Sequence, residues 1–158
     1  MTLTTNTAME TVHEALVRGV EGDLTGGAEL LLPLLTNGTG TQYAVASMLA
    51  EIASFITRRD QVSGPVPMLV PNEVTSAGAI EATPPGIAFA AEFTTAWANR
   101  EHDTAEGLFA ALVRTTTGDG IELLDALIAL FQMAVATSVE IVAEQRRAAG
   151  ITGKGPVL

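Results

Sequence analysis

The sequence predicts an all-α protein, a six-helix array of two similar three-helix units joined by a proline-rich extended segment. Apolar residues make up 47% of the 158 residues and aromatic residues only 4%, and much of the apolar content is alanine, the best helix former. Apolar positions recur every three or four residues, the period of an amphipathic helix, rather than in alternating runs. Helix start and stop signals also recur at a spacing of eighty residues.

The first unit, residues 1–60, is expected to contain three helices, over 8–22, 24–35 and 41–58. Pro33 within the second helix predicts a kink or an early end, because proline lacks the amide that continues the hydrogen-bond ladder. Each helix has an apolar face at helical spacing. These faces are Met9, Val12, Leu16 and Val20; Ala28, Leu31, Leu32 and Leu35; and Val45, Leu49, Ile52 and Ile56.

The second unit, residues 84–150, is expected to contain helices over 84–100, 104–114 and 120–149. Thr83 as a cap and Pro84 at the first helical position predict the start of its first helix. The last helix is the longest and is apolar on nearly all sides, so we expect it at the centre of the array, packed against the helix over 41–58. Residues 151–158 are predicted to be a frayed tail.

An internal repeat is indicated by the punctuation between helices. Thr39–Gln42, Asp103–Glu106 and Asp119–Glu122 each have the capping-box arrangement, in which a capping residue is followed three positions later by Gln or Glu. Gly38 and Gly118 precede two of these boxes and suit the left-handed residue that ends a helix. A shift of eighty residues aligns identical residues, among them Glu21 with Glu101, Asp23 with Asp103, Gly27 with Gly107 and Leu32 with Leu112.

The connecting arm, residues 61–83, contains three prolines and an apolar core with Val66, Met68 and Leu69. Connections of this length without regular structure are uncommon within compact domains. Two interpretations are open. The arm is either a strap that packs its hydrophobic side chains across both units, or a polyproline-like segment that docks into a partner or a second subunit.

Charge argues against a nucleic-acid partner. The formal net charge is −10, which repels a phosphate backbone. The two basic pairs, Arg58–Arg59 and Arg146–Arg147, each lie at the end of an expected helix, where cations suit the helix dipole. Between Asp125 and Glu140 the last helix has fourteen uncharged residues, fewer than the ~20 that span a bilayer. With no secretory signal at the N-terminus, the expected location is the cytoplasm.

No set of residues in the sequence forms a known catalytic, metal or cofactor motif, and cysteine is absent. Glu10 and His13 have the spacing of one half-site of a di-metal helical bundle, which needs that motif twice. Glu101, His102 and Asp103 are explained by helix capping, with an enzyme built on them as a low-ranking hypothesis. We therefore expect no cofactor and no metal, and favour a non-catalytic protein over an enzyme.

The sequence leaves two hypotheses for function. The first is a non-catalytic interaction, assembly or regulatory protein that forms a homodimer, or binds another protein, through its last helix. Its interface would use Leu127, Phe131 and Val135 with the arm residues Val66, Met68 and Leu69. The alternative is a binder of a small hydrophobic ligand in the second unit. Its pocket would be lined by the aromatic cluster Phe89, Phe93, Trp97, Phe109 and Phe131, which core packing also explains.

Overall fold

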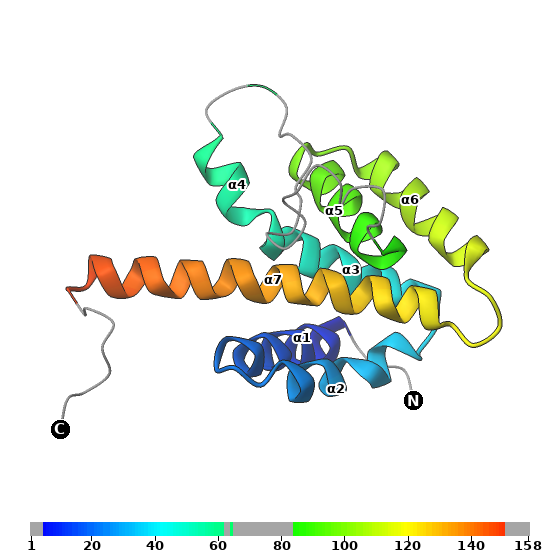
Figure 1. Cartoon of the computed structure of the whole chain (residues 1–158), viewed down its shortest axis with the longest axis horizontal. Helices are drawn as coiled ribbons and strands as arrows, with labels where there is room; N and C mark the ends of the chain where they lie inside the picture. The colour runs from blue at the N-terminus through cyan, green and yellow to red at the C-terminus, as the bar shows by residue number, and fades with distance from the viewer. Residues whose placement is uncertain (1–4, 62–63, 65–83, 151–158) are drawn as a thin grey trace.

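A computed structural model of the chain describes residues 5–61, 64 and 84–150. Within these ranges it contains seven helices and no strand (Figure 1), which confirms the all-α class. The arm and the tail lie outside the described residues, apart from Gln61 and Gly64. The helices are α1 (Thr5–Val20), α2 (Leu24–Leu35), α3 (Thr39–Ala53), α4 (Phe55–Asp60), α5 (Pro85–Ala98), α6 (His102–Thr115) and α7 (Ile121–Ala148).

The helix α7 is the centre of the array. Helices α1 and α2 pack on one side of it and α5 on another, with α6 beyond α5, while α3 crosses behind α7 (Figure 1). The packing of α3 against α7 is the contact expected between the third and last helices. Because α7 is surrounded by several helices rather than one, its first half is buried on most of its circumference.

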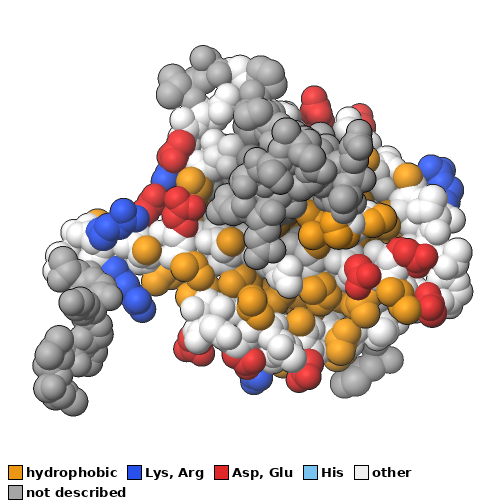
Figure 2. All heavy atoms as spheres, viewed as in Figure 1, with side chains coloured by type: hydrophobic (Ala, Val, Ile, Leu, Met, Phe, Trp, Pro, Cys, Tyr) orange, Lys and Arg blue, Asp and Glu red, His pale blue; other side chains and the backbone are white. Residues whose placement is uncertain are grey.

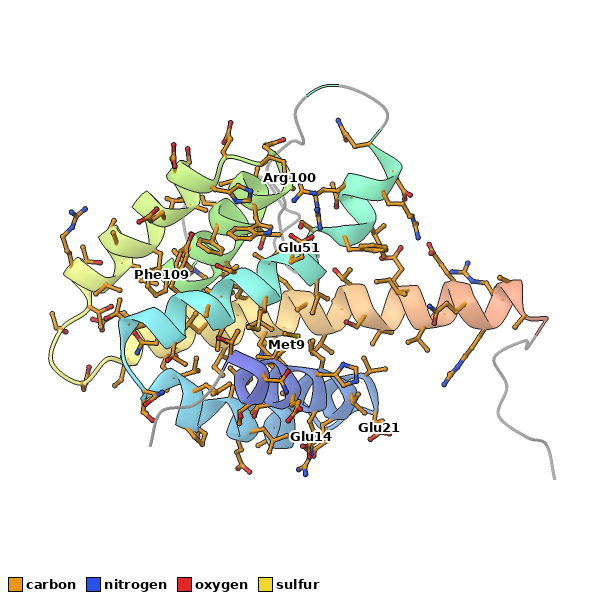
Figure 3. All side chains as sticks on the ribbon, turned by 180° about the vertical axis from the view of Figure 1, so that it is seen from behind. Met9, Glu14, Glu21, Glu51, Arg100 and Phe109 are labelled. Atoms are coloured by element: carbon orange, nitrogen blue, oxygen red, sulfur yellow. The ribbon has the colours of Figure 1, made fainter. Side chains whose placement is uncertain are left out.

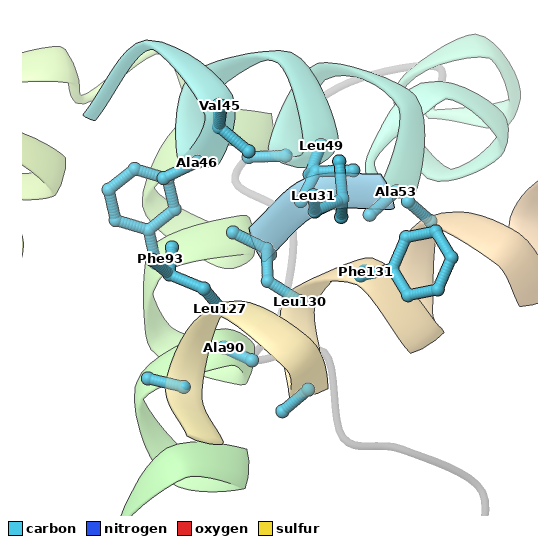
Figure 4. Packing of buried hydrophobic residues seen from close by; sticks show 14 of the residues in the cluster. Leu31, Val45, Ala46, Leu49, Ala53, Ala90, Phe93, Leu127, Leu130 and Phe131 are labelled. Atoms are coloured by element: carbon cyan, nitrogen blue, oxygen red, sulfur yellow. The ribbon is translucent and has the colours of Figure 1, made fainter. Parts of the chain in front are cut away.

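Buried side chains from both halves of the chain belong to a single hydrophobic cluster. Leu31, Leu49, Phe93, Leu130 and Phe131 are all fully buried within it (Figure 4). Burying a side chain of this size contributes roughly 1.5–3 kcal/mol. The association of α1, α2, α3, α5 and α7 is therefore driven by this shared core.

Close approach of α1 and α2 to α7 depends on two glycines. A Cβ at Gly19 would lie 2.5 Å from Val135 Cγ2, and one at Gly27 would lie 2.8 Å from Phe131 Cζ. Both distances are too short for ordinary van der Waals contact. The absence of a side chain at these two positions is what allows the Phe131 ring and Val135 to seat between α1 and α2.

The helix expected over 41–58 is wrong as a single element, because it divides into α3 and α4 at Ser54. The Ser54 hydroxyl donates to the Glu51 carbonyl at 3.3 Å, and the Thr137 hydroxyl on α7 donates to the Ala53 carbonyl at 3.1 Å. Hydroxyl groups that bond to backbone carbonyls compete with helical hydrogen bonds. This competition, in part from a residue distant in sequence, accounts for the break.

Asp23 is the N-cap of α2, and its carboxylate accepts a hydrogen bond from the Gly26 amide at 2.9 Å. The three predicted capping boxes do not form, because the N-caps of α3, α6 and α7 make no side-chain capping bond. Their N-caps are Gly38, Glu101 and Gly120. Asp119 nevertheless accepts a hydrogen bond from the Ile121 amide, the first amide of α7, at 3.4 Å. The side-chain amide of Gln42 instead donates from Nε2 to the Leu35 carbonyl at 2.6 Å, at the end of α2.

Three further expectations about local structure need correction. Helix α2 keeps its expected bounds, Leu24–Leu35, so Pro33 does not end it early. Met9 and Leu32, expected on buried faces, are 53% and 40% exposed. The left-handed glycine before α7 is Gly120, with φ of 72°, rather than Gly118.

Candidate interaction surface on the last helix

The second half of α7 extends past the helices that bury the first half (Figure 1). Buried residues of α7 end at Val135, and every residue from 136 to 148 is half-buried or exposed. Apolar residues nevertheless continue in this half, with Val139, Ile141 and Val142. The apolar spacing of a core helix therefore continues into the half of α7 that the other described helices cover only in part.

An outer face of α7 turns away from the core along its whole length. Its members recur every three or four residues, and each is exposed or half-buried. Ile121 is 53% exposed and Val139 is 45% exposed. Figure 2 shows hydrophobic side chains gathered in a band along α7. We define the outer face as Ile121, Asp125, Ile128, Gln132, Ala136, Val139, Val142 and Arg146.

The interface residues expected from the sequence lie elsewhere. Leu127, Phe131 and Val135 are 1%, 0% and 5% exposed, so they belong to the core of a single chain and are not accessible to a second molecule. The physical reason is that α1, α2, α3 and α5 cover this side of α7. The remaining expected interface residues, Val66, Met68 and Leu69, lie outside the described residues.

An ion-pair cluster joins α4 to the second half of α7. The Arg59 guanidinium donates to both carboxylate oxygens of Glu144, at 2.8 and 3.2 Å, and to Asp60 at 2.7 Å. Hydrogen bonds from Arg59 hold the pKa values of Glu144 and Asp60 below their ordinary range. Arg58 and Arg59 do lie in the last turn of α4, but they also make specific contacts between helices.

A second polar cluster, at the junction of α3, α4 and α5, centres on Glu51 (Figure 3). Its carboxylate accepts from Trp97 Nε1 at 2.6 Å and from Arg58 at 2.6 Å, and Arg100 lies 3.9 Å away. Partial burial raises the pKa of Glu51, but hydrogen bonds from Trp97 and Arg58 and the charges of Arg58 and Arg100 outweigh it and lower the pKa.

Sequence reasoning missed this junction. A half-buried indole usually finds an acceptor for its N–H, so Trp97 was a signal that one exists. Nothing in the sequence identified Glu51, which lies 46 positions away, as that acceptor.

The aromatic residues proposed as a ligand pocket are divided between two places. Phe89, Phe93 and Trp97 stack along α5 with ring centroids 5.2 and 6.0 Å apart. Tyr43, which the sequence did not single out, packs edge-on against Phe93 and Phe109. Phe131 lies instead toward Gly19 and Gly27, at the other end of the core from Phe93 (Figure 4). These rings fill space by packing on one another, and the ligand hypothesis stays a prediction.

Both histidines of the sequence, His13 and His102, are exposed. His102 packs edge-on against Trp97 with centroids 4.6 Å apart and lines a shallow depression formed by residues 100–104. Its neighbour Asp103 lies in the first turn of α6, where an acid suits the helix dipole. Among the described residues, no group of three or more His, Asp or Glu side chains is placed to hold a metal ion.

By length and composition, α7 is long and apolar enough to cross a membrane, although its fourteen uncharged residues predict no span. The core helix of a compact protein meets the same criteria. In the most apolar part of α7, 33% of the residues are buried inside the structure.

Comparison with models of protein families, with characterised proteins and with solved structures gives no match for this chain.

Proposed function

We propose that this chain is a non-catalytic interaction or assembly protein that self-associates through the outer face of α7. The single observation that carries the proposal is the second half of α7, which projects beyond the core helices and still contains the apolar residues Val139, Ile141 and Val142. A helix that only completed a core would have no physical need for Val139, Ile141 and Val142 in its projecting half.

The energetics favour covering this face. Isolated exposed apolar side chains are normal on a protein surface. Apolar side chains repeated along one face of a long helix are different, because together they form a patch of the kind that marks an interface. Moving the exposed parts of Ile121, Ile128, Val139 and Val142 out of water contributes on the order of 1 kcal/mol for each side chain.

The polar groups of the described residues support a structural role. Glu51, Arg58, Arg59 and Glu144 are engaged with one another or with neighbouring helices through short hydrogen bonds. These contacts fix α4 against α5 and α7. They thereby hold the projecting half of α7 in one orientation, which an interaction surface requires.

We also infer that the chain arose by duplication of a three-helix module. The helix bounds support this, since α2 ends at residue 35 and α6 ends at residue 115, a spacing of eighty. The third members differ, because α3 ends at residue 53 while α7 extends to residue 148. If the chain arose in this way, the projecting half of α7 is an extension of the third helix that the first module lacks.

The proposal is tested by measuring the mass of the purified full chain with size-exclusion chromatography and light scattering. Over about 1 to about 100 µM, mass action should drive the chain toward twice its 16.4 kDa. Val139→Asp should shift the mass toward the monomer, because it puts a charge into the buried contact.

Val17→Asp on α1 is the matched control, since Val17 is 43% exposed and Val139 is 45% exposed. It should leave the dimer unchanged, and circular dichroism should show that both variants keep their helix content. A wild-type monomer at every concentration, or equal effects of the two substitutions, would refute self-association through this face.

A further inference from the structure

The charges on the outer face of α7 are segregated along its length. The only charged members of the outer face are Asp125, near the start of the helix, and Arg146, near its end; the exposed Glu140 lies beside this face and is not part of it. The 21 positions between Asp125 and Arg146 correspond to about 32 Å along a helix. The outer face therefore has an acidic end and a basic end, with uncharged and mostly apolar side chains between them.

We propose, building on self-association through α7, that the occupant of the outer face is a second copy of this chain whose α7 runs antiparallel. A two-fold axis midway between residues 135 and 136 places Asp125 opposite Arg146 of the second copy, and by symmetry Arg146 opposite Asp125 of the second copy. The same register places Gln132 opposite Val139 of the second copy. Ile128 then lies opposite Ala143 of the second copy.

Charge complementarity selects this occupant and this direction. A parallel pair would set acid against acid and base against base, whereas the antiparallel pair sets acid against base at both ends. The full chain has a net charge of −10, so two copies repel one another unless opposite charges meet at the contact. Arg146 and Arg147 are among only seven arginines in the sequence, and they lie at the end where this arrangement needs them.

Side-chain size at the crossing point agrees with the same geometry. Ala136 is exposed and small, and it lies at the middle of the outer face. Small residues at the point where two helices cross let the backbones approach to the distance at which flanking side chains interdigitate. A bulky residue at this position would hold Val139 and its opposite partner apart.

Cysteine cross-linking of the full chain tests the register directly, because the natural sequence contains no cysteine. Ala136→Cys should form an intermolecular disulfide under mild oxidation, since the two copies of residue 136 meet at the axis. Asp125→Cys alone should not cross-link, because its two copies lie about 32 Å apart in this register. A mixture of Asp125→Cys and Arg146→Cys chains should cross-link to each other.

Charge reversal gives an independent readout of the dissociation constant of the dimer. Asp125→Arg and Arg146→Asp should each weaken the dimer by at least about tenfold, and the double variant should recover most of that loss. Glu106→Arg changes the net charge as much as Asp125→Arg does. Glu106 is exposed on α6, which packs mainly on α5, so this control should leave the dissociation constant unchanged.

The outcomes separate this inference from the proposed function. A wild-type dimer that Val139→Asp weakens, but that cross-links equally well through residues 125 and 136 or ignores both charge reversals, overturns the antiparallel register alone. A wild type that stays monomeric overturns both and leaves the outer face to a different protein. Cross-linking at residue 136 together with recovery in the double variant supports the register.

Discussion

Gly19 lies where α1 meets α7, and its replacement by alanine perturbs the closest contact between these helices. A Cβ on Gly19 would lie 2.5 Å from Val135 Cγ2, 3.1 Å from Val135 Cγ1 and 3.4 Å from Phe131 Cζ. The first distance is about 1 Å shorter than the van der Waals contact distance between two carbon atoms. Val135 is itself only 5% exposed, so its side chain has little room to move aside.

Two opposing effects set the size of the change in the free energy of unfolding. Alanine is favoured over glycine within a helix by about 1 kcal/mol. Overpacking a filled core costs about 1–3 kcal/mol, and a displacement of about 1 Å between two packed helices belongs at the upper end of that range. We expect Gly19→Ala to destabilise the protein by about 1–2 kcal/mol, measured by urea unfolding followed by circular dichroism.

Gly107→Ala on α6 is the matched control, because nothing lies within 4 Å of a Cβ at that position. This variant should show only the propensity gain, a stabilisation of about 1 kcal/mol. In a Gly19→Ala, Val135→Ala double variant the new methyl group fills space that the valine vacates, so we expect a favourable coupling of about 1 kcal/mol or more. If Gly19→Ala stabilises the chain as Gly107→Ala does, the described packing of α1 on α7 is incorrect.

Three other substitutions test local features of the fold. Asp23→Ala should lower the free energy of unfolding by about 1 kcal/mol, because it removes the cap of α2. Asp103→Ala should lower it by less than half as much in the same urea titration, because Asp103 caps no helix. Equal losses would contradict the described caps. Glu51→Gln should lower the free energy of unfolding by about 1 kcal/mol at pH 7. The pKa of Glu51 is lowered in the fold, so the ionised carboxylate stabilises the protein at pH values above its ordinary pKa of 4.5, and this stabilisation is lost as the pH falls. The difference from wild type, followed by fluorescence of the single tryptophan, should therefore shrink in acid, and a difference that grows there would contradict the pKa direction. Thr137→Val should lower the free energy of unfolding by about 1 kcal/mol, because it removes the hydrogen bond to the last carbonyl of α3. Thr115→Val, which removes only bonds to the Ala111 and Leu112 carbonyls within α6, should lower it less.

Several elements of the fold follow from the sequence alone, because their signals are local. Helix α2 begins and ends where the sequence predicts, since a capping aspartate precedes it and leucines recur at helical spacing. The all-α class follows from alanine content and periodicity in the same way. Such signals act between residues a few positions apart, so no knowledge of the tertiary structure is needed to read them.

The tertiary structure decided which sides of these helices are covered. An apolar pattern on nearly all sides of α7 does not distinguish an inner from an outer face, so the sequence pointed to Leu127, Phe131 and Val135 as an interface, and the neighbouring helices bury all three. The break at Ser54 depends in part on a hydroxyl more than eighty positions away, and the Trp97 partner on a carboxylate 46 positions away. Contacts of this kind exist only after helices distant in sequence have packed, which is why periodicity predicts the helices but not the face that they leave open to solvent.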